Sequence, residues 1–212
     1  MSDTAVWFDL DGTLCHHERP FDRLVADALV AAGARSPPDG AYDVCAERIF
    51  STLEACESEP YAQAFDQVAT VLEVDVDPAE AAAAYRELER EATTVTETAR
   101  DVLAAVGSRA PVGVLTNGDG PHERAKLADH GLDEILDAVV VSNEVGVRKP
   151  DPELFAVAED RLDAGRHVHV ADEFETDVLP AQQAGWDAVH VRNDDGPAAS
   201  VNDLGALGTL LL

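Results

Sequence analysis

Short apolar runs alternate with longer amphipathic stretches along most of the chain. Runs rich in β-branched residues and bounded by turn residues predict five buried strands, at residues 6–8, 112–115, 138–142, 167–171 and 188–191. Apolar residues at helical spacing predict the helices between the later strands, at residues 97–108, 121–130, 152–162 and 178–184. This alternation is typical of parallel βαβ units, so we expect an α/β fold with a Rossmann-like, five-stranded parallel sheet.

The stretch between the first two strands has a different pattern. Apolar positions at helical spacing predict four helices, at residues 18–32, 42–53, 61–72 and 78–91, with no strand pattern among them. We therefore expect two domains: an α/β core made of residues 1–15 and 96–212, and a small all-helical insertion made of residues 16–95. Residues 193–212 are expected to form a tail whose last apolar residues pack on an outer face of the core.

The composition predicts a strongly acidic surface. The 212 residues include 42 acidic and 15 basic side chains, which gives a formal net charge of −27 at pH 7. Such a surface repels nucleic acid and anionic lipid, so we expect neither nucleic acid nor a membrane as a partner. The only lysines are Lys126 and Lys149. An acidic, lysine-poor surface resembles the proteins of extreme halophiles, because at molar salt the Debye length is about 3 Å and carboxylate repulsion is screened.

The cysteines and the apolar runs indicate the cellular location of the protein. Cys15, Cys45 and Cys56 are an odd number in one region, which favours reduced thiols over a disulfide framework. No apolar run approaches the roughly 20 residues of a membrane span, and the first strand begins too early to leave room for a signal peptide. We therefore expect a cytoplasmic protein. Cys15-His16-His17 lacks further metal ligands at useful spacing and is interpreted as the start of a linker.

Two aspartates directly follow the first predicted strand. Asp9 and Asp11 are spaced i, i+2, and Gly12 lets the backbone turn sharply after them. Ligands of a parallel sheet bind beyond the carboxyl ends of its strands, so both carboxylates are expected at a binding site. A divalent cation such as Mg²⁺ would offset their mutual repulsion, and an aspartate can also take up a phosphoryl group as a nucleophile. The alternative is a turn that carries solvated acids.

Four segments of the chain carry a resemblance to a known family. Asp9-Leu10-Asp11-Gly12-Thr13 resembles the first motif of the haloacid dehalogenase-like (HAD) hydrolase superfamily. Three more motifs follow in the family's order, at Thr116-Asn117-Gly118, at Lys149-Pro150-Asp151-Pro152 and at Asp172 to Asp177. Each lies beside a predicted strand, and together they span nearly the whole chain. The resemblance implies a HAD-like core whose inserted helical cap acts as a lid over the active site.

The resemblance also implies catalytic roles for the acid pair. Asp9 is expected to be the nucleophile, and Asp11 the general acid and base that protonates the leaving oxygen and then activates water. The dehalogenase branch of the superfamily lacks a carboxylate at the position of Asp11. Its presence here therefore favours phosphoryl over halide chemistry.

The second and third motifs are expected to neutralise phosphoryl charge. The hydroxyl of Thr116 and the backbone amides around Asn117 and Gly118 would donate hydrogen bonds to phosphoryl oxygens, although a hydrogen-bonded strand-exit turn explains the same residues. Lys149 would offset the charge of the acids and the phosphoryl group. Lys126 falls in a helix that we expect to be peripheral and is interpreted as structural.

The fourth motif completes the expected Mg²⁺ site. The resemblance implies the ligands Asp9, Asp11, Asp172 and Asp177, with Asp177 acting through water or instead orienting Lys149. The motif departs from the family pattern at two positions. Ala171 replaces the usual glycine, which still permits close packing at negative φ. Glu173 replaces a small residue and is either a further carboxylate beside the metal or a solvated acid.

These features together predict a Mg²⁺-dependent phosphatase that hydrolyses a small phosphomonoester through an aspartyl-phosphate. The alternatives are a phosphosugar mutase, in which the substrate instead of water accepts the phosphoryl group, and a non-catalytic HAD-like binding protein. A phosphonate hydrolase would need a cap lysine for a Schiff base, and no lysine precedes Lys126. The expected partner is a small phosphorylated metabolite, and the protein is expected to be a monomer or homodimer. Specificity is expected to depend on the cap, which carries Arg19, Arg23, Arg48, Arg86 and Arg90.

Overall fold

The computed structural model describes residues 3–191 and divides the chain into two compact units. One unit ends its first segment at His16 and resumes at Thr94, and the other unit is His17–Thr93. The domain boundaries expected from the sequence, at residues 15/16 and 95/96, differ from these by one or two residues. The tail expected at residues 193–212 lies outside the described residues. Among the described helices, none combines the length and the apolar character that crossing a membrane requires.

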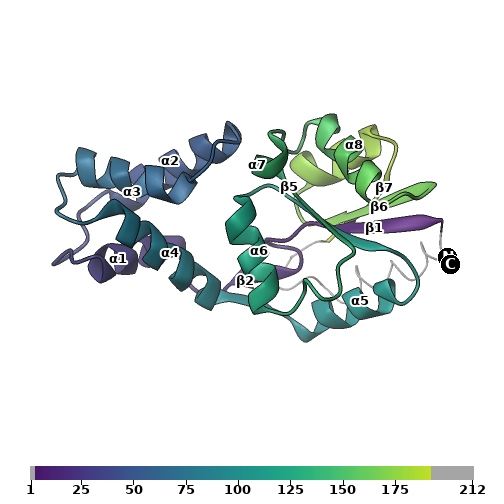
Figure 1. Ribbon diagram of the computed structural model, residues 1–212, viewed down its shortest axis with the longest axis horizontal. Helices are drawn as coiled ribbons and strands as arrows, with labels where there is room; N and C mark the ends of the chain where they lie inside the picture. The colour runs from purple at the N-terminus through teal and green to yellow at the C-terminus, as the bar shows by residue number, and fades with distance from the viewer. Residues whose placement is uncertain (1–2, 192–212) are drawn as a thin grey trace. The chain divides into compact units, whose positions relative to one another are not determined.

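The first unit is built on a five-stranded parallel sheet, which confirms the expected α/β fold (Figure 1). Its strands are β1 (Thr4–Phe8), β4 (Val112–Thr116), β5 (Ala138–Val141), β6 (Arg166–Ala171) and β7 (Asp187–His190). They lie in the order β5-β4-β1-β6-β7, so β1 is the central strand. Phe8 is paired with Val114 on one side and with Val170 on the other. The residues that follow β1 therefore leave the sheet at the middle of its carboxyl edge.

Helices cover both faces of this sheet (Figure 1). Helices α5 (Glu97–Gly107) and α6 (Gly120–Asp129) pack on one face, and α8 (Pro152–Arg161) and α9 (Leu179–Gln183) pack on the other. Successive side chains of a strand point to opposite faces, so β1 contributes to both cores. Val6 and Phe8 join the apolar cluster with α5, whereas Ala5 and Trp7 join the cluster with α8. Burial on both faces explains why the strand is a continuous apolar run without alternation.

Two short elements of this unit were not expected from the sequence. Helix α7 (Ser142–Val145) follows β5 directly, and a π-helical turn, η1 (Phe174–Val178), precedes α9. The helix expected at residues 178–184 is therefore divided between these two elements. Elements of four or five residues are too short to show a hydrophobic period, so the sequence pattern does not reveal them.

Cys15-His16-His17, interpreted as the start of a linker, lies where the first unit ends and the second begins, but it also has regular structure. These residues form β2 (Cys15–His17), which pairs with β3 (Thr93–Val95) in a separate two-stranded sheet. Nε2 of His16 lies 2.9 Å from the hydroxyl of Thr94, and the His17 ring binds the buried carboxylate of Glu89. Three-residue strands carry no alternation, and their pairing partners are far apart in the chain, so the pattern along the sequence does not predict them.

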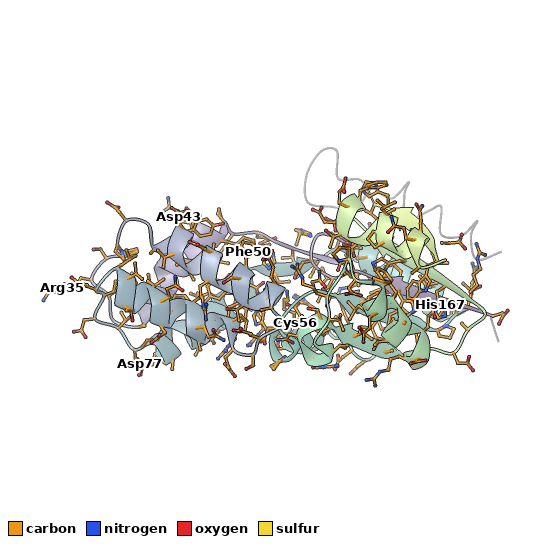
Figure 2. All side chains as sticks on the ribbon, turned by 90° about the horizontal axis from the view of Figure 1, so that it is seen from above. Arg35, Asp43, Phe50, Cys56, Asp77 and His167 are labelled. Carbon is orange, nitrogen blue, oxygen red and sulfur yellow. The ribbon has the colours of Figure 1, made fainter. Side chains whose placement is uncertain are left out.

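The second unit is all-helical apart from its share of these short strands. Its helices are α1 (Phe21–Ala31), α2 (Ala41–Glu54), α3 (Pro60–Val71) and α4 (Pro78–Ala92), close to the expected ranges. It has an apolar core of its own, in which Tyr61 and Phe65 of α3 pack against Tyr85 of α4. Asp77, marked in Figure 2, caps α4 by accepting a hydrogen bond from the backbone amide of Ala79 at 2.8 Å.

Candidate active site

Three of the predicted site residues meet in the buried interior of the α/β unit. Asp9 follows β1 directly, and its carboxylate Oδ1 accepts a hydrogen bond from Nζ of Lys149 at 2.7 Å. The same Nζ donates to the backbone carbonyl of Leu115 at 2.9 Å and binds the carboxylate of Asp177. Lys149 is only 1% exposed, so its charge is compensated by protein groups instead of water. The contact favours the role of orienting Lys149, which was one of the two roles considered for Asp177.

In this cluster one cation, Lys149, contacts two buried carboxylates, Asp9 and Asp177. The pKa values of these two acids shift in opposite directions. Burial raises the pKa of Asp9 to about 7 from its ordinary value of 3.8, although the charge of Lys149 opposes the shift. Burial acts in the same direction on Asp177, but attraction to Lys149 and a hydrogen bond from His169 outweigh it and hold the pKa of that carboxyl below its usual range. Lys149 neutralises one of the two acids. Asp9 therefore needs further positive charge nearby to be fully ionised at neutral pH.

A histidine that the sequence analysis did not single out supports this arrangement. His169 lies on β6, is fully buried, and places Nε2 3.0 Å from Oδ1 of Asp177. Burial lowers the pKa of His169, so the neutral ring is favoured and Nε2–H donates to the carboxylate. The sequence shows a histidine at this position of a buried strand, but only the pairing of distant segments identifies its partner.

The expectation that Lys126 lies in a peripheral helix is wrong. Its side chain is 2% exposed, and Nζ lies 2.7 Å and 2.9 Å from the two carboxylate oxygens of Asp11. Asp11 itself is more accessible, with 39% of its side chain exposed. The sequence analysis did not predict this contact, because Lys126 and helix α6 lie outside the four motifs.

The second motif serves to position Lys149. Nδ2 of Asn117 donates to the backbone carbonyl of Lys149 at 3.0 Å, and the backbone amide of Lys149 donates to Oδ1 of Asn117 at 2.9 Å. The amide of Gly118 donates to the hydroxyl of Ser142 at 3.0 Å. Thr116 is buried at the end of β4. Asn117 and Gly118, two of the three residues expected to bind substrate, thus have polar groups that bind other parts of the protein. The contact with Ser142 was not predicted, because Ser142 lies outside the four motifs.

The fourth motif packs directly against the first. The hydroxyl of Thr13 donates to Oδ1 of Asp172 at 3.0 Å and accepts from the backbone amide of Asp172 at 3.1 Å. Gly12 has φ +85°, and a Cβ atom at that position would lie 2.2 Å from Oδ2 of Asp172. Only glycine leaves room for this approach. Burial raises the pKa of Asp172, although the hydrogen bond from Thr13 opposes the shift.

The two departures from the family pattern have different consequences. Ala171 is fully buried at the end of β6, where its methyl group is accommodated in the packing. Glu173 is exposed and precedes the π-helical turn η1, which favours its interpretation as a solvated acid.

The four predicted metal ligands do not form one set. Within residues 3–191, no group of three or more His, Cys, Asp or Glu side chains could hold a metal ion by itself. Asp11 binds Lys126 and Asp177 binds Lys149. Asp9, which binds Lys149 through Oδ1, and Asp172 lie at the carboxyl ends of the adjacent strands β1 and β6. Mg²⁺ is commonly held by one or two carboxylates together with water and substrate phosphate, so a pair of acids is enough to bind it.

Three of the arginines named above contact partners within the helical unit. Arg19 binds Asp27, Arg48 binds the side-chain carbonyl of Gln63, and Nη1 of Arg86 lies 3.7 Å from Glu59. These contacts give those arginines a structural role in the unit.

The fold and the acid cluster together define an α/β protein with a polar site at the carboxyl edge of its parallel sheet. Residues 4–185 match the family model of the haloacid dehalogenase-like hydrolases, and the chain belongs to this family. Among solved structures, the HAD-hydrolase YfnB from Bacillus subtilis bound to magnesium has the same fold, with a TM-score of 0.72, 20% identity and coverage of 98% of each chain. A 2-haloacid dehalogenase from Pseudomonas syringae also shares it, with a TM-score of 0.68, 22% identity and coverage of 98% and 97%.

Curated relatives indicate which branch of the family the chain resembles. It is 31% identical over 148 residues to the pyrimidine 5'-nucleotidase YjjG of Escherichia coli, a match that covers 65% of this chain and 66% of that protein, just under two thirds. It is 26% identical over 200 residues to a glyceraldehyde 3-phosphate phosphatase of Methanopyrus kandleri, covering 89% of this chain and 83% of that protein. The chain is therefore a hydrolase, and its phosphatase relatives support action on phosphate esters.

Proposed function

We propose that this protein is a Mg²⁺-dependent phosphatase that hydrolyses a small phosphomonoester through an aspartyl-phosphate on Asp9. The observation that carries the proposal is the contact of Asp9 with the buried Lys149, with the second acid, Asp11, two residues further on. A nucleophilic carboxylate needs a nearby cation, and an ester oxygen that departs needs a proton donor. The chain supplies all three groups.

The proposed reaction has two steps. In the first, a carboxylate oxygen of Asp9 attacks phosphorus, the bond from phosphorus to the ester oxygen breaks, and Asp11 gives that oxygen a proton. In the second, Asp11 takes a proton from water, the water oxygen attacks phosphorus, and the bond between phosphorus and Asp9 breaks to release phosphate. Lys149 remains charged throughout and offsets the negative charge that gathers around Asp9.

The donor groups fit a magnesium ion. Asp9 and Asp172 offer the hard oxygen ligands that Mg²⁺ prefers, and burial raises the pKa of both carboxyl groups. We propose these two as ligands, because Lys126 contacts both oxygens of Asp11 and Asp177 binds both Lys149 and His169, whereas Lys149 contacts Asp9 through Oδ1. When bound, the ion would supply positive charge that keeps the carboxylates ionised and draws the substrate phosphoryl oxygens to the site.

The proposed substrate is a small phosphorylated metabolite. The relatives named above act on a nucleotide and on a triose phosphate, so the shared feature is the phosphomonoester and not the group that carries it. A formal net charge of −27 disfavours polyanionic partners such as nucleic acid or an anionic membrane. The role of the helical unit as a lid that selects small substrates stays a prediction from the sequence resemblance. So do the cytoplasmic location and the monomeric or dimeric state.

Hydrolysis of p-nitrophenyl phosphate in high potassium chloride tests the proposal. We expect turnover with Mg²⁺, none with a chelator, and none in Asp9→Asn. Asp101→Asn, which changes an exposed acid on α5, is the matched control and should retain full activity. Once turnover is established, a screen of phosphorylated metabolites in the same salt would identify the substrate class.

Two alternatives predict different results in these experiments. A phosphosugar mutase would convert a sugar phosphate to its isomer faster than it releases phosphate. A non-catalytic binding protein would show no Mg²⁺-dependent turnover of any phosphomonoester, and this result would overturn the proposed function.

A further inference from the structure

Both lysines of the chain lie in the candidate active site. Fifteen basic residues include only two lysines, and each is almost completely buried against one aspartate of the first motif. Lys149 binds Asp9, and Lys126 binds Asp11. The resemblance to the family accounts for Lys149 through the third motif but assigns nothing to Lys126. Each lysine thus binds one aspartate of the first motif, and the role of Lys126 beside Asp11 needs an explanation.

Lys126 is held in place from its own helix. Its Nζ lies 2.7 Å from Oε2 of Glu123, one turn earlier in α6, and Glu123 is also buried. A buried lysine is costly unless its charge is paired, and here two carboxylates pair it. The ion pair with Glu123 holds the amine on one side, and the amine donates its hydrogen bonds to both oxygens of Asp11.

The turn of the second motif leaves space for this anchor. A Cβ atom on Gly118 would lie 2.5 Å from Oε1 of Glu123, so a side chain at position 118 would displace the glutamate. Helix α6 begins at Gly120, immediately after the turn. The second motif is thus linked to Asp11 through Glu123 and Lys126, two residues that lie outside the four motifs.

The position of the Asp11 carboxylate depends on its contact with Lys126. Its side chain is 39% exposed, and it lies in the turn that follows β1, not in the strand itself. The thiol of Cys15 lies 3.4 Å from Oδ1, whereas Lys126 contacts both oxygens. A half-exposed carboxylate samples several rotamers unless a fixed group holds it.

We infer that Lys126 is a positioning residue: it fixes the Asp11 carboxylate where a proton can be delivered to the departing ester oxygen. This inference rests on the proposed function. The proton moves from Asp11 to the leaving oxygen as the bond from phosphorus to that oxygen breaks, and Lys126 neither gains nor loses a proton. Misplacing a proton donor slows only reactions whose leaving group needs the proton.

Two substrates of similar shape make the inference testable. p-Nitrophenolate departs with little help, whereas phenolate, whose conjugate acid has a pKa of about 10, depends more on protonation. The quantity to compare is kcat/KM with Mg²⁺ in high potassium chloride, because it covers only the steps through departure of the alcohol. For Lys126→Met we expect a fall of about 10-fold or more with phenyl phosphate and less than about 3-fold with p-nitrophenyl phosphate, on the scale of general acid catalysis.

Controls separate positioning from folding. Arg124 lies on the same helix as Lys126 and forms an exposed ion pair with Glu144 of α7. Arg124→Met breaks this pair and should leave the turnover of both substrates unaffected. If Lys126→Met does not fold, Lys126→Arg retains the charge but cannot place the same atom on Asp11, and it should show the same selective loss. A crystal structure of whichever variant folds should show the Asp11 carboxylate moved from its place beside α6.

A double-variant comparison decides whether Lys126 acts through Asp11. In an Asp11→Asn background, Lys126→Met should change kcat/KM for phenyl phosphate by less than about 2-fold, because the proton donor is already absent. An equal loss with both substrates, or losses that multiply in the double variant, would overturn the inference and indicate phosphate binding by Lys126. If the wild-type protein hydrolyses neither substrate, the proposed function fails first.

Discussion

Nζ of Lys149 lies 2.7 Å from Oδ1 of Asp9, although 140 residues separate the two in the chain. The parallel pairing of β1 with β4, and of β4 with β5, brings these segments to one edge of the sheet. The contact gives the proposed nucleophile a fixed counter-charge in a place that excludes water. It also makes the two aspartates after β1 unequal, because Asp9 is buried and Asp11 is half-exposed.

The first prediction separates the roles of these two acids. Asp9→Asn removes the nucleophile and should abolish turnover and phosphoenzyme together, since an amide cannot form the acyl-phosphate. Asp11→Asn retains the nucleophile and should lose about 10²–10⁴-fold in turnover. With p-nitrophenyl phosphate the first step should survive better than the second, so Asp11→Asn should accumulate phosphate on Asp9. Peptide mass spectrometry after an acid quench measures this, and phosphoenzyme in Asp9→Asn would contradict the assignment.

The second prediction concerns the close approach of Gly12 and Asp172. Gly12→Ala would place Cβ 2.2 Å from Oδ2 of Asp172 at φ +85°, so the carboxylate must move. We expect a loss of roughly 10- to 100-fold in kcat/KM from the misplaced carboxylate. Gly131→Ala is the matched control, because φ is +63° there and nothing lies within 4 Å of the added Cβ. The control should cost about 1–2 kcal/mol of folding free energy without loss of activity. Equal activities would show that Asp172 is not constrained by this contact.

The third prediction is the pH dependence of stability without metal. The folded protein raises the pKa of Asp9 to about 7 from 3.8, mainly by burial, so Asp9 binds more protons when folded. Its stabilising contribution is complete below about pH 4 and is lost as the pH rises through 7. Relative to wild type, Asp9→Asn should therefore gain up to about 1.4 kcal/mol in unfolding free energy for each pH unit across that window. Denaturant titrations with a chelator in high salt measure the difference. A difference that does not change with pH would exclude an unusually weak acid at position 9.

The fourth prediction follows from the charge of the whole chain. A formal net charge of −27 on 212 residues produces strong self-repulsion when salt is low. At molar salt the Debye length is about 3 Å and most of this repulsion is screened. We expect partial unfolding or inactivation below a few tenths molar potassium chloride, an order of magnitude set by the same screening argument. Melting temperatures measured across a potassium chloride series test this, and a constant melting temperature would contradict it.

By itself, the sequence determined the α/β framework and the position of the acids along the chain. Buried strands are continuous apolar runs, and the residue after each run must lie at the carboxyl edge of a parallel sheet, so the placement of Asp9 and Asp172 at that edge follows from local pattern. The helices of the insertion were predicted to within a few residues for the same reason, because their apolar positions repeat over several turns. The motifs added the expectation that Lys149 joins these acids.

Only the tertiary structure decided which charges pair. Lys126 has the sequence surroundings of a surface lysine, yet the packing of α6 on the sheet buries it against Asp11. Asp177 was open between two roles until its contact with Lys149 favoured one of them. Partners such as these lie far apart in the chain, and the free energy of an ion pair depends on distance and burial, which no local pattern of residues contains.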